Sequence, residues 1–347
     1  MENRFSFVFY ALNRHSYVSG LSYFKQKKIS LSWVLLIKGR DFYTKESDWY
    51  DILECYLNGK KLWSGGFYSS SSAVKMLIKS YRVYSYLKKN RFRSSFEVKF
   101  VFTNYTDIPT LVAYQNILNV SEVVLVDDGM VVFNTAARRH KSKKPVLKDA
   151  VLSKSKFLGL FVKFILKRMG FSYPSIDSIT FYSVFPIENR VSRDDRFLRN
   201  RVGQDFTNVD VRSGVAHFVS QPILTLNIAS EFAFKLAIDQ VAKKYKVVTY
   251  FPHRHESEKE LKIVRKYKNI KIMKDSKPYE EYLKDSKYCP GAIISFYSSV
   301  LYTLYDLPKE CNLLFVSIPE DHLTTENKDT VLNVFNSLSE DDRFERL

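Results

Sequence analysis

Residues 121–130, SEVVLVDDGM, combine an apolar run with two carboxylates and a glycine, and this combination is the first indication of the fold. Residues 123–126 form a short apolar run that favours a buried strand. The run ends in Asp127, Asp128 and Gly129, which are ordinary turn residues. Carboxylates at the carboxyl end of a strand also line the ligand crevice of open α/β sheets. The same residues therefore fit either a turn or a site of chemistry.

The chain on both sides of this stretch alternates between strand-like and helix-like segments. This alternation predicts an α/β fold with largely parallel sheets. Strands are expected at 5–12, 32–37, 95–103, 121–128, 178–185, 215–224, 246–256, 269–274 and 311–318, helices at 69–90, 107–118, 154–171, 231–245, 257–267, 277–285 and 327–344, and a strand that runs into a helix at 291–307.

A polar, non-periodic stretch at 186–214 interrupts the alternation, and this is the expected domain junction. A chain of 347 residues exceeds the size at which single cores usually stop growing, so two domains are expected. We expect two Rossmann-like, doubly wound domains that face each other across a cleft, as in the GT-B architecture. The expected boundaries are 1–213, 214–325 and a C-terminal helix in 326–347 that packs back on the N-terminal domain.

Composition narrows the class of partner. The formal net charge is +17, which favours anionic partners, although the basic residues are spread along the chain rather than gathered in one arm. The three cysteines, Cys55, Cys289 and Cys311, lack the spacing of a zinc ribbon or a disulfide framework. A reducing, cytoplasmic compartment is therefore expected.

One segment has the pattern of a membrane-surface helix. Residues 154–171 combine Lys and Arg with Phe, Leu and Ile at roughly helical spacing, and they are too charged to span a bilayer. Such a helix either lies on the anionic inner face of the cytoplasmic membrane or packs on a protein core. Both interpretations stay open at this point.

Three polar clusters follow apolar strands in the same way. They are Asp127-Asp128-Gly129, residues 252–256, and Ser298-Ser299. Carboxyl ends of parallel strands meet at one edge of a sheet, so two domains with these edges inward would bring all three clusters together. This shared position is a stronger indication of a site than any single motif.

Each C-terminal cluster has a functional and a structural interpretation. Ser298 and Ser299 begin a helix, where a serine either caps the helix or binds a phosphate. His253 and His255 alternate, which is compatible with a metal pair, with charge or a proton for a departing phosphate, or with solvated histidines. Glu280 either complements a helix dipole or accepts hydrogen bonds from ribose hydroxyls.

The ordered motifs resemble a known family. VDDGM, FVSQPIL, YFPHRHE, KPYEEYL and ISFYSSVLYTL follow one another as in the bacterial sialyltransferases of GT-B fold, nearest the alpha-2,8-polysialyltransferase-like family. The resemblance covers residues 100–305, and each motif is short. It implies an N-terminal acceptor-binding domain and a C-terminal domain that binds a CMP-sugar.

For the N-terminal domain, the resemblance implies that Asp127 is the general base that deprotonates the acceptor hydroxyl. Asp128 and Gly129 would shape the turn that holds this base.

For the C-terminal domain, it implies that His253 contacts the donor phosphate, that Ser298 and Ser299 bind the same phosphate, and that Glu280 holds the ribose. Gln221 would line the donor pocket. The family has His before Pro, whereas Pro252 precedes His253 here, which leaves His255 as a rival for the catalytic role.

The reaction implied is metal-independent, inverting transfer of a sialic acid or related nonulosonic acid from CMP to a cell-surface glycan such as lipooligosaccharide or capsule. The leaving group is a monophosphate, so neither a metal nor another cofactor is expected, and no nucleic acid is expected as a partner. Two other hypotheses stay open from the residues: a non-catalytic protein that binds nucleic acid or an anionic surface, and a metal hydrolase that uses His253 and His255.

Overall fold

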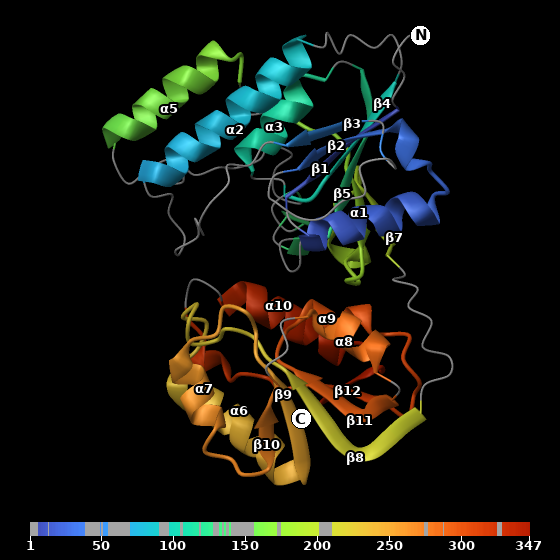
Figure 1. Ribbon diagram of the computed structural model, residues 1–347, viewed down its shortest axis with the longest axis vertical. Helices are drawn as coiled ribbons and strands as arrows, with labels where there is room; N and C mark the ends of the chain where they lie inside the picture. Colours follow the sequence, from blue (N-terminus) through green and yellow to red (C-terminus); the bar gives the residue numbers. More distant parts are fainter. Residues whose placement is uncertain are drawn as a thin grey trace. The chain divides into compact units, whose positions relative to one another are not determined.

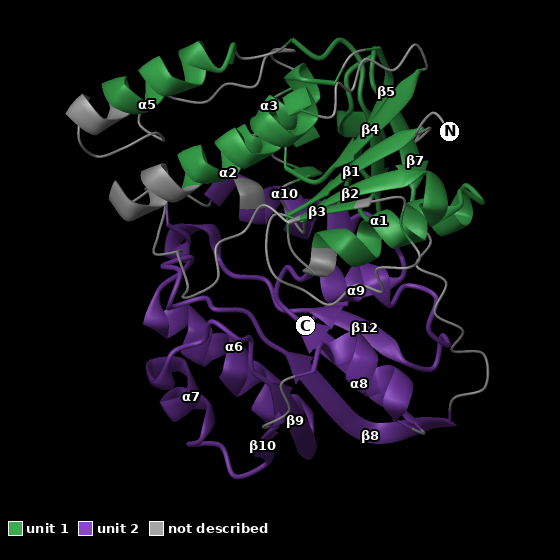
Figure 2. Ribbon diagram, turned by 45° about the horizontal axis from the view of Figure 1, so that its top comes forward, with its two compact units in different colours: residues 1–200 green, residues 201–347 purple. Residues whose placement is uncertain are grey.

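The computed structural model describes residues 6–12, 14–38, 49, 51–54, 70–89, 97–104, 107–117, 119–127, 132–133, 135–136, 139, 156–171, 175–200, 210–273, 277–286, 288–324 and 328–347. The chain forms two compact units, residues 1–200 and 201–347, which are coloured separately in Figure 2. Each unit is built on one parallel sheet with helices packed against it, as the alternation in the sequence predicts. The predicted α/β, two-domain Rossmann-like fold is therefore confirmed.

The first unit contains a seven-stranded sheet in the order β3-β2-β1-β4-β5-β6-β7. Every neighbouring pair of these strands is parallel. The elements are β1 (Phe7–Ala11), α1 (Arg14–Gln26), β2 (Val34–Lys38), β3 (Asp51–Glu54), α2 (Ser70–Lys89), β4 (Val98–Phe102), α3 (Ile108–Gln115), β5 (Val120–Val126), α5 (Lys156–Arg168), β6 (Thr180–Ser183) and β7 (Arg196–Arg199), with short 3-10 turns at Leu31–Trp33 and Glu188–Arg190.

Helices cover both faces of this sheet, so β1 and β2 are buried along their whole length. Helix α1 packs Phe24 against Phe7 and Phe9 on one face, and Figure 1 shows α2 and α3 on the other. Gly20 of α1 lies directly over Phe9, because a Cβ atom at this position would approach the Phe9 ring to 2.1 Å. This close approach holds α1 against the centre of the sheet.

The second unit contains a six-stranded parallel sheet in the order β10-β9-β8-β11-β12-β13. Renumbered from its first strand, this is the 3-2-1-4-5-6 order of a dinucleotide-binding fold. The elements are β8 (Asp210–Val219), α6 (Glu231–Lys244), β9 (Val247–Phe251), α7 (Glu258–Val264), β10 (Ile270–Ile272), α8 (Tyr279–Asp285), β11 (Tyr288–Ser295), α9 (Ser299–Thr303), β12 (Asn312–Phe315), a 3-10 turn at Glu320–His322, α10 (Lys328–Ser339) and β13 (Phe344–Arg346).

Alternate residues of β8 define the two faces of the second sheet. Phe218 contacts Phe296, which in turn stacks with Phe234 of α6. His217 points to the other face, where its ring contacts Tyr279 and Tyr282 of α8. The central strand is therefore covered on both sides, and polar groups gather at its carboxyl end.

Four described elements were not expected from the sequence. They are α1, β3, β7 and β13. Strand β7 lies inside the polar stretch 186–214 that was expected to be a junction, and it extends the first sheet beside β6. Strand β13 pairs with β12 and closes the edge of the second sheet.

Candidate functional site

The carboxyl edge of the second sheet has its switch point between β8 and β11, the two central strands. Two hydrogen bonds join the ends of these strands. Ser295 Oγ donates to the carbonyl of Val219 at 2.6 Å, and the Tyr297 N–H donates to Oε1 of Gln221 at 2.9 Å. Gln221 and the segment before Ser298 therefore form one rigid unit at the place where α/β sheets bind ligands.

Ser298 and Ser299 begin α9 in the way the sequence predicts. Ser298 is the N-cap, and its Oγ accepts a hydrogen bond from the Val300 N–H at 3.2 Å. The capping interpretation is confirmed for this residue. A hydroxyl that accepts in a cap keeps its own hydrogen for donation, so capping and phosphate binding are compatible at Ser298.

His253 lies in the loop after β9 and is held by a tight turn. Its Nδ1 accepts from the His255 N–H at 3.2 Å, and its carbonyl accepts from the Glu256 N–H at 2.8 Å. Burial, with the neighbouring His255 and Arg254, lowers the pKa of His253 to about 4. The imidazole is therefore neutral at pH 7, and because Nδ1 is an acceptor, Nε2 carries the hydrogen.

His255 is more exposed to solvent than His253. It is exposed, and its ring centroid lies 5.3 Å from that of His253. Within the described ranges, no group of three or more His, Cys, Asp or Glu residues is placed to hold a metal ion. The pair therefore gains no third ligand from the described part of the chain.

Glu280 lies at the start of α8 and is linked to the capped helix. The Thr303 hydroxyl lies 3.1 Å from Glu280 Oε1 and 3.0 Å from the carbonyl of Val300. Thr303 ends α9, and Val300 is the residue whose N–H binds the Ser298 cap. This chain of contacts fixes Glu280 relative to Ser298.

A buried triad behind the His253 loop was not assigned from the sequence. The Tyr250 hydroxyl lies 2.6 Å from Ser220 Oγ and 3.1 and 3.2 Å from the two oxygens of Glu256, and Ser220 also hydrogen-bonds Glu256. The hydrogen bonds of Ser220 and Tyr250 to Glu256 favour its ionised form and so act against the effect of its burial.

Burial has the larger effect on the carboxyl group of Glu256. Burial raises the pKa of Glu256 to about 8, against the opposing effect of the Ser220 hydrogen bond. Glu256 is the last residue of the motif YFPHRHE, and its place directly after the His253–His255 pair was the only sequence signal for it.

Glu260 holds the loop that follows β8. Its carboxylate accepts from the Leu224 N–H at 2.8 Å, from the Thr225 hydroxyl, and from the Ser257 N–H at 2.8 Å in a capping box. Although burial opposes ionisation, these hydrogen bonds lower the pKa of Glu260. A buried carboxylate thus ties the Gln221 loop to the start of α7.

Asp127 lies in the first unit at the carboxyl end of β5, where it was predicted. Its side chain is buried at 1% exposure, and Oδ2 accepts from the Val184 N–H after β6 at 2.7 Å. Burial raises the pKa of the nearby Tyr182 to about 12; a hydrogen bond from Ser22 opposes the shift, and the charge of Asp127 adds to it. Asp128 and Gly129, also predicted for this site, lie outside the described residues.

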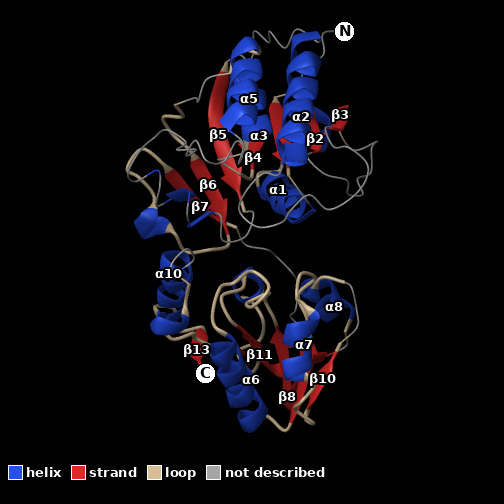
Figure 3. Ribbon diagram, turned by 90° about the vertical axis from the view of Figure 1, so that its left-hand side faces the viewer, coloured by secondary structure: helices blue, strands red, loops and turns tan. Residues whose placement is uncertain are grey.

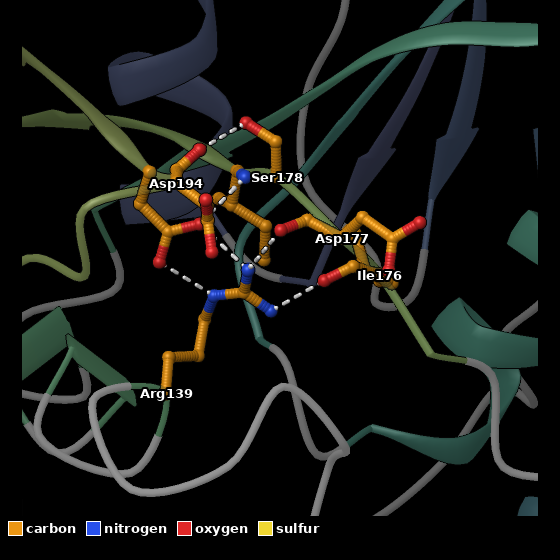
Figure 4. A network of polar contacts seen from close by, with 7 residues as sticks. Arg139, Ile176, Asp177, Ser178 and Asp194 are labelled. Carbon is orange, nitrogen blue, oxygen red and sulfur yellow. Dashed lines mark hydrogen bonds and ion pairs between the residues drawn. The ribbon is translucent and has the colours of Figure 1, made fainter.

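Arg139 forms a buried ion pair in the first unit that was not predicted from the sequence. Its guanidinium forms a bidentate pair with Asp195, at 2.8 Å from Nε and 2.6 Å from Nη2, and also donates to the Ile176 carbonyl at 2.9 Å (Figure 4). The Ile179 N–H donates to the same carboxylate at 2.8 Å. The pair is buried and joins Arg139 to the residues that precede β6 and β7, at the amino edge of the first sheet.

No helix in the described part of the chain combines the length and the apolar character that crossing a bilayer requires.

Comparison with known proteins gives weak structural likenesses. No protein-family model matches the chain, and no curated protein matches it. Among solved structures, it is similar to a 2,6-sialyltransferase of Photobacterium sp. JT-ISH-224 in a ternary complex with CMP and lactose, at 10% identity, TM-score 0.47, and coverage of 99% of this chain and 78% of that one.

Two further glycosyltransferase structures are similar to the same extent. Glycosyltransferase SnogD of Streptomyces nogalater has 13% identity and a TM-score of 0.46 over 97% of this chain and 95% of its own. UGT2 of Phytolacca americana, in complex with UDP-2-fluoro-glucose and pterostilbene, has 10% identity and a TM-score of 0.47 over 98% and 84%.

Proposed function

We propose that this protein is a glycosyltransferase that moves a sialic acid or related nonulosonic acid from its CMP donor to a hydroxyl of a cell-surface glycan. Lipooligosaccharide and capsule are the acceptor classes we expect, and the reaction would take place in the cytoplasm. The observation that carries the proposal is the polar edge at the switch point of the second sheet, where Gln221, Ser298, His253 and Glu280 come from four neighbouring segments.

The donor would bind at this edge. Hydroxyls of Ser298 and Ser299 suit the phosphate oxygens of CMP, and the carboxylate of Glu280 suits two ribose hydroxyls. The Gln221–Tyr297 hydrogen bond fixes the loop before Ser298, so these groups are positioned before the donor arrives. A preorganised set of donors costs less to order on binding than mobile side chains.

His253 would stabilise the departing phosphate as a hydrogen-bond donor. Its pKa of about 4 makes the free imidazole neutral, and its tautomer places the hydrogen on Nε2. A neutral N–H donor aimed at the phosphate strengthens as negative charge develops there. His255 is exposed, which favours His253 for this role.

Asp127 would act as the general base. It takes the proton of the acceptor hydroxyl, the hydroxyl oxygen bonds the anomeric carbon, and the bond from that carbon to the phosphate oxygen breaks with its electron pair on CMP. The Val184 N–H bond occupies Oδ2 and holds the carboxylate in place for this proton transfer. We propose that no metal is needed, because the leaving group is a monophosphate.

The test is calorimetric titration of the purified chain with CMP in the presence of EDTA. Micromolar binding is expected for the wild type. The variant Ser298→Ala/Ser299→Ala removes two phosphate donors and is expected to bind about tenfold or more weakly.

A matched control uses Ser286→Ala. Ser286 also makes two hydrogen bonds, to the carbonyls of Leu283 and Tyr288, but it lies before β11 at the opposite edge of the sheet. It should leave CMP binding unchanged. A folded wild-type protein that does not bind CMP would refute the proposal, as would an equal loss in both variants.

A further inference from the structure

Two neighbouring helices of the first unit form an exposed basic and apolar surface. Helices α2 and α5 lie side by side, as Figures 1 and 3 both show. Their sequences contain five and four Lys or Arg residues, respectively, and neither contains Asp or Glu. We call the outward faces of these two helices the α2–α5 surface.

Helix α5 divides its apolar residues between two faces. Val162 and Leu166 are buried against the unit, which is the packing role expected for this segment. Leu160, Phe161 and Phe164 stay 66%, 50% and 54% exposed. The packing of α5 on the first unit therefore leaves three large apolar side chains of this helix exposed.

Helix α2 continues the same pattern. Its buried residues recur every three to four positions, and the opposite face exposes Tyr81 and Ile78 beside Arg82, Lys88 and Lys89. Lys163, Lys167 and Arg168 flank the exposed apolar residues of α5 in the same way. Apolar and basic side chains thus alternate over both helices.

We infer that the α2–α5 surface docks the protein on an anionic lipid bilayer. Large apolar side chains on a protein surface mark an interaction site. An apolar stripe with only basic residues around it matches the boundary between acyl chains and negative head groups, where Phe and Leu enter the chains and Lys and Arg remain among the phosphates. An acid-free surface also lacks the negative side chains that a bilayer of this charge would repel.

This inference stands apart from the proposed reaction, because it uses no residue of the candidate site. The test is sedimentation of the full chain with vesicles of phosphatidylcholine, alone or with about one-third phosphatidylglycerol. The wild type should sediment with the anionic vesicles only, and added salt should weaken the binding.

Two double variants distinguish binding through the α2–α5 surface from nonspecific hydrophobic adsorption to the vesicles. Phe161→Ser/Phe164→Ser should bind at least about tenfold more weakly. The matched pair Phe232→Ser/Leu236→Ser removes two exposed apolar residues of α6 in the second unit and should bind like the wild type. Circular dichroism checks that each variant is folded.

The charges are tested in the same way. Lys163→Glu/Lys167→Glu should lose binding to the anionic vesicles, whereas Lys266→Glu/Lys268→Glu, with the same change of charge at exposed positions of the second unit, should retain most of it. These four lysines are exposed, and circular dichroism again checks that each variant is folded. Absence of wild-type sedimentation, or equal losses within the matched pairs, would overturn the inference.

Discussion

The two units share the strand order 3-2-1-4-5-6, to which the first unit adds a seventh strand, but polar side chains at the carboxyl edges of the two sheets differ in exposure. In the first unit, Asp127 is buried and accepts a hydrogen bond from the Val184 N–H. In the second unit, Gln221, His253 and Ser298 are partly exposed and held by neutral hydrogen bonds. The same topology therefore supports a locked carboxylate in one unit and an accessible polar edge in the other.

This difference suggests a division of labour. A base needs one fixed carboxylate, and rigid burial supplies it. A donor site has to exchange a charged ligand with water, so partial exposure suits it. The following predictions test whether the two edges differ as described, starting with the largest expected effect.

Arg139→Ala should cost about 3 to 5 kcal/mol of unfolding free energy, because it leaves the buried carboxylate of Asp195 without its partner. Denaturant unfolding followed by circular dichroism measures this loss. The control is Arg265→Ala, which breaks the exposed pair with Glu258 and should cost far less, because water screens this pair. Equal costs would show that the buried pair contributes no more to the stability of the first unit than an exposed one.

Asp127→Asn should lower the transfer rate at least about 100-fold, since a general base typically contributes 10²–10⁴. The amide oxygen can still accept from the Val184 N–H, so the fold should be retained. CMP affinity, measured by calorimetry, should stay unchanged because the donor contacts that we propose all belong to the second unit. A variant with wild-type turnover, or one that loses CMP binding, would contradict the division of labour.

Most of the fold could be predicted from the sequence, because apolar runs and amphipathic periods repeat the β–α unit. Helix α1 was missed because its glycine and serines are poor helix formers, and packing of Phe24 on Phe9 compensates for this. Strand β13 was missed because it is short and charged. It is held by the Leu347 N–H bond to Phe315 and by Arg343, which donates to four carbonyls.

The candidate site was predictable where its residues follow strands, as Gln221, His253 and Ser298 do. The partners that fix them were not, because Glu256 meets Ser220 and Arg139 meets Asp195 only after the chain folds. Ser220 and Glu256 are 36 positions apart and Arg139 and Asp195 are 56 positions apart, and local sequence patterns do not predict contacts over such separations. The reactive groups were thus easier to predict than the groups that hold them.

Glu256→Gln should remove one pH-dependent contribution to stability. With a folded pKa of about 8, the native state holds a proton that the unfolded state releases above its ordinary value of 4.5. Stability is therefore fully present below pH 4.5 and falls as the pH rises towards 8, by up to about 1.4 kcal/mol per pH unit. The amide mimics the protonated acid and lacks this contribution, so the unfolding free energy of Glu256→Gln minus that of the wild type should rise between pH 5 and pH 8. A slope equal to that of the wild type would show that Glu256 is ionised in the fold.

Glu280→Gln has the smallest expected effect and tests the donor edge most closely. Glutamine keeps an oxygen for the Thr303 hydroxyl, so the contact between α8 and α9 should remain. It removes the negative charge that strengthens hydrogen bonds from ribose, so CMP should bind about fivefold more weakly.

Glu281→Gln is the matched control, because it changes the same charge one residue away on α8 and should leave the affinity near the wild-type value. Titration with 2′-deoxy-CMP completes a double-mutant cycle. If Glu280 binds the ribose, the penalty of Glu280→Gln shrinks when the 2′-hydroxyl is absent, because the two changes remove the same contact. An equal penalty for CMP and 2′-deoxy-CMP would place this hydroxyl away from Glu280. The carboxylate would then serve only to join α8 to α9. CMP binding at the carboxyl edge of the second sheet would in that case depend on neutral hydrogen bonds and not on the charge of Glu280.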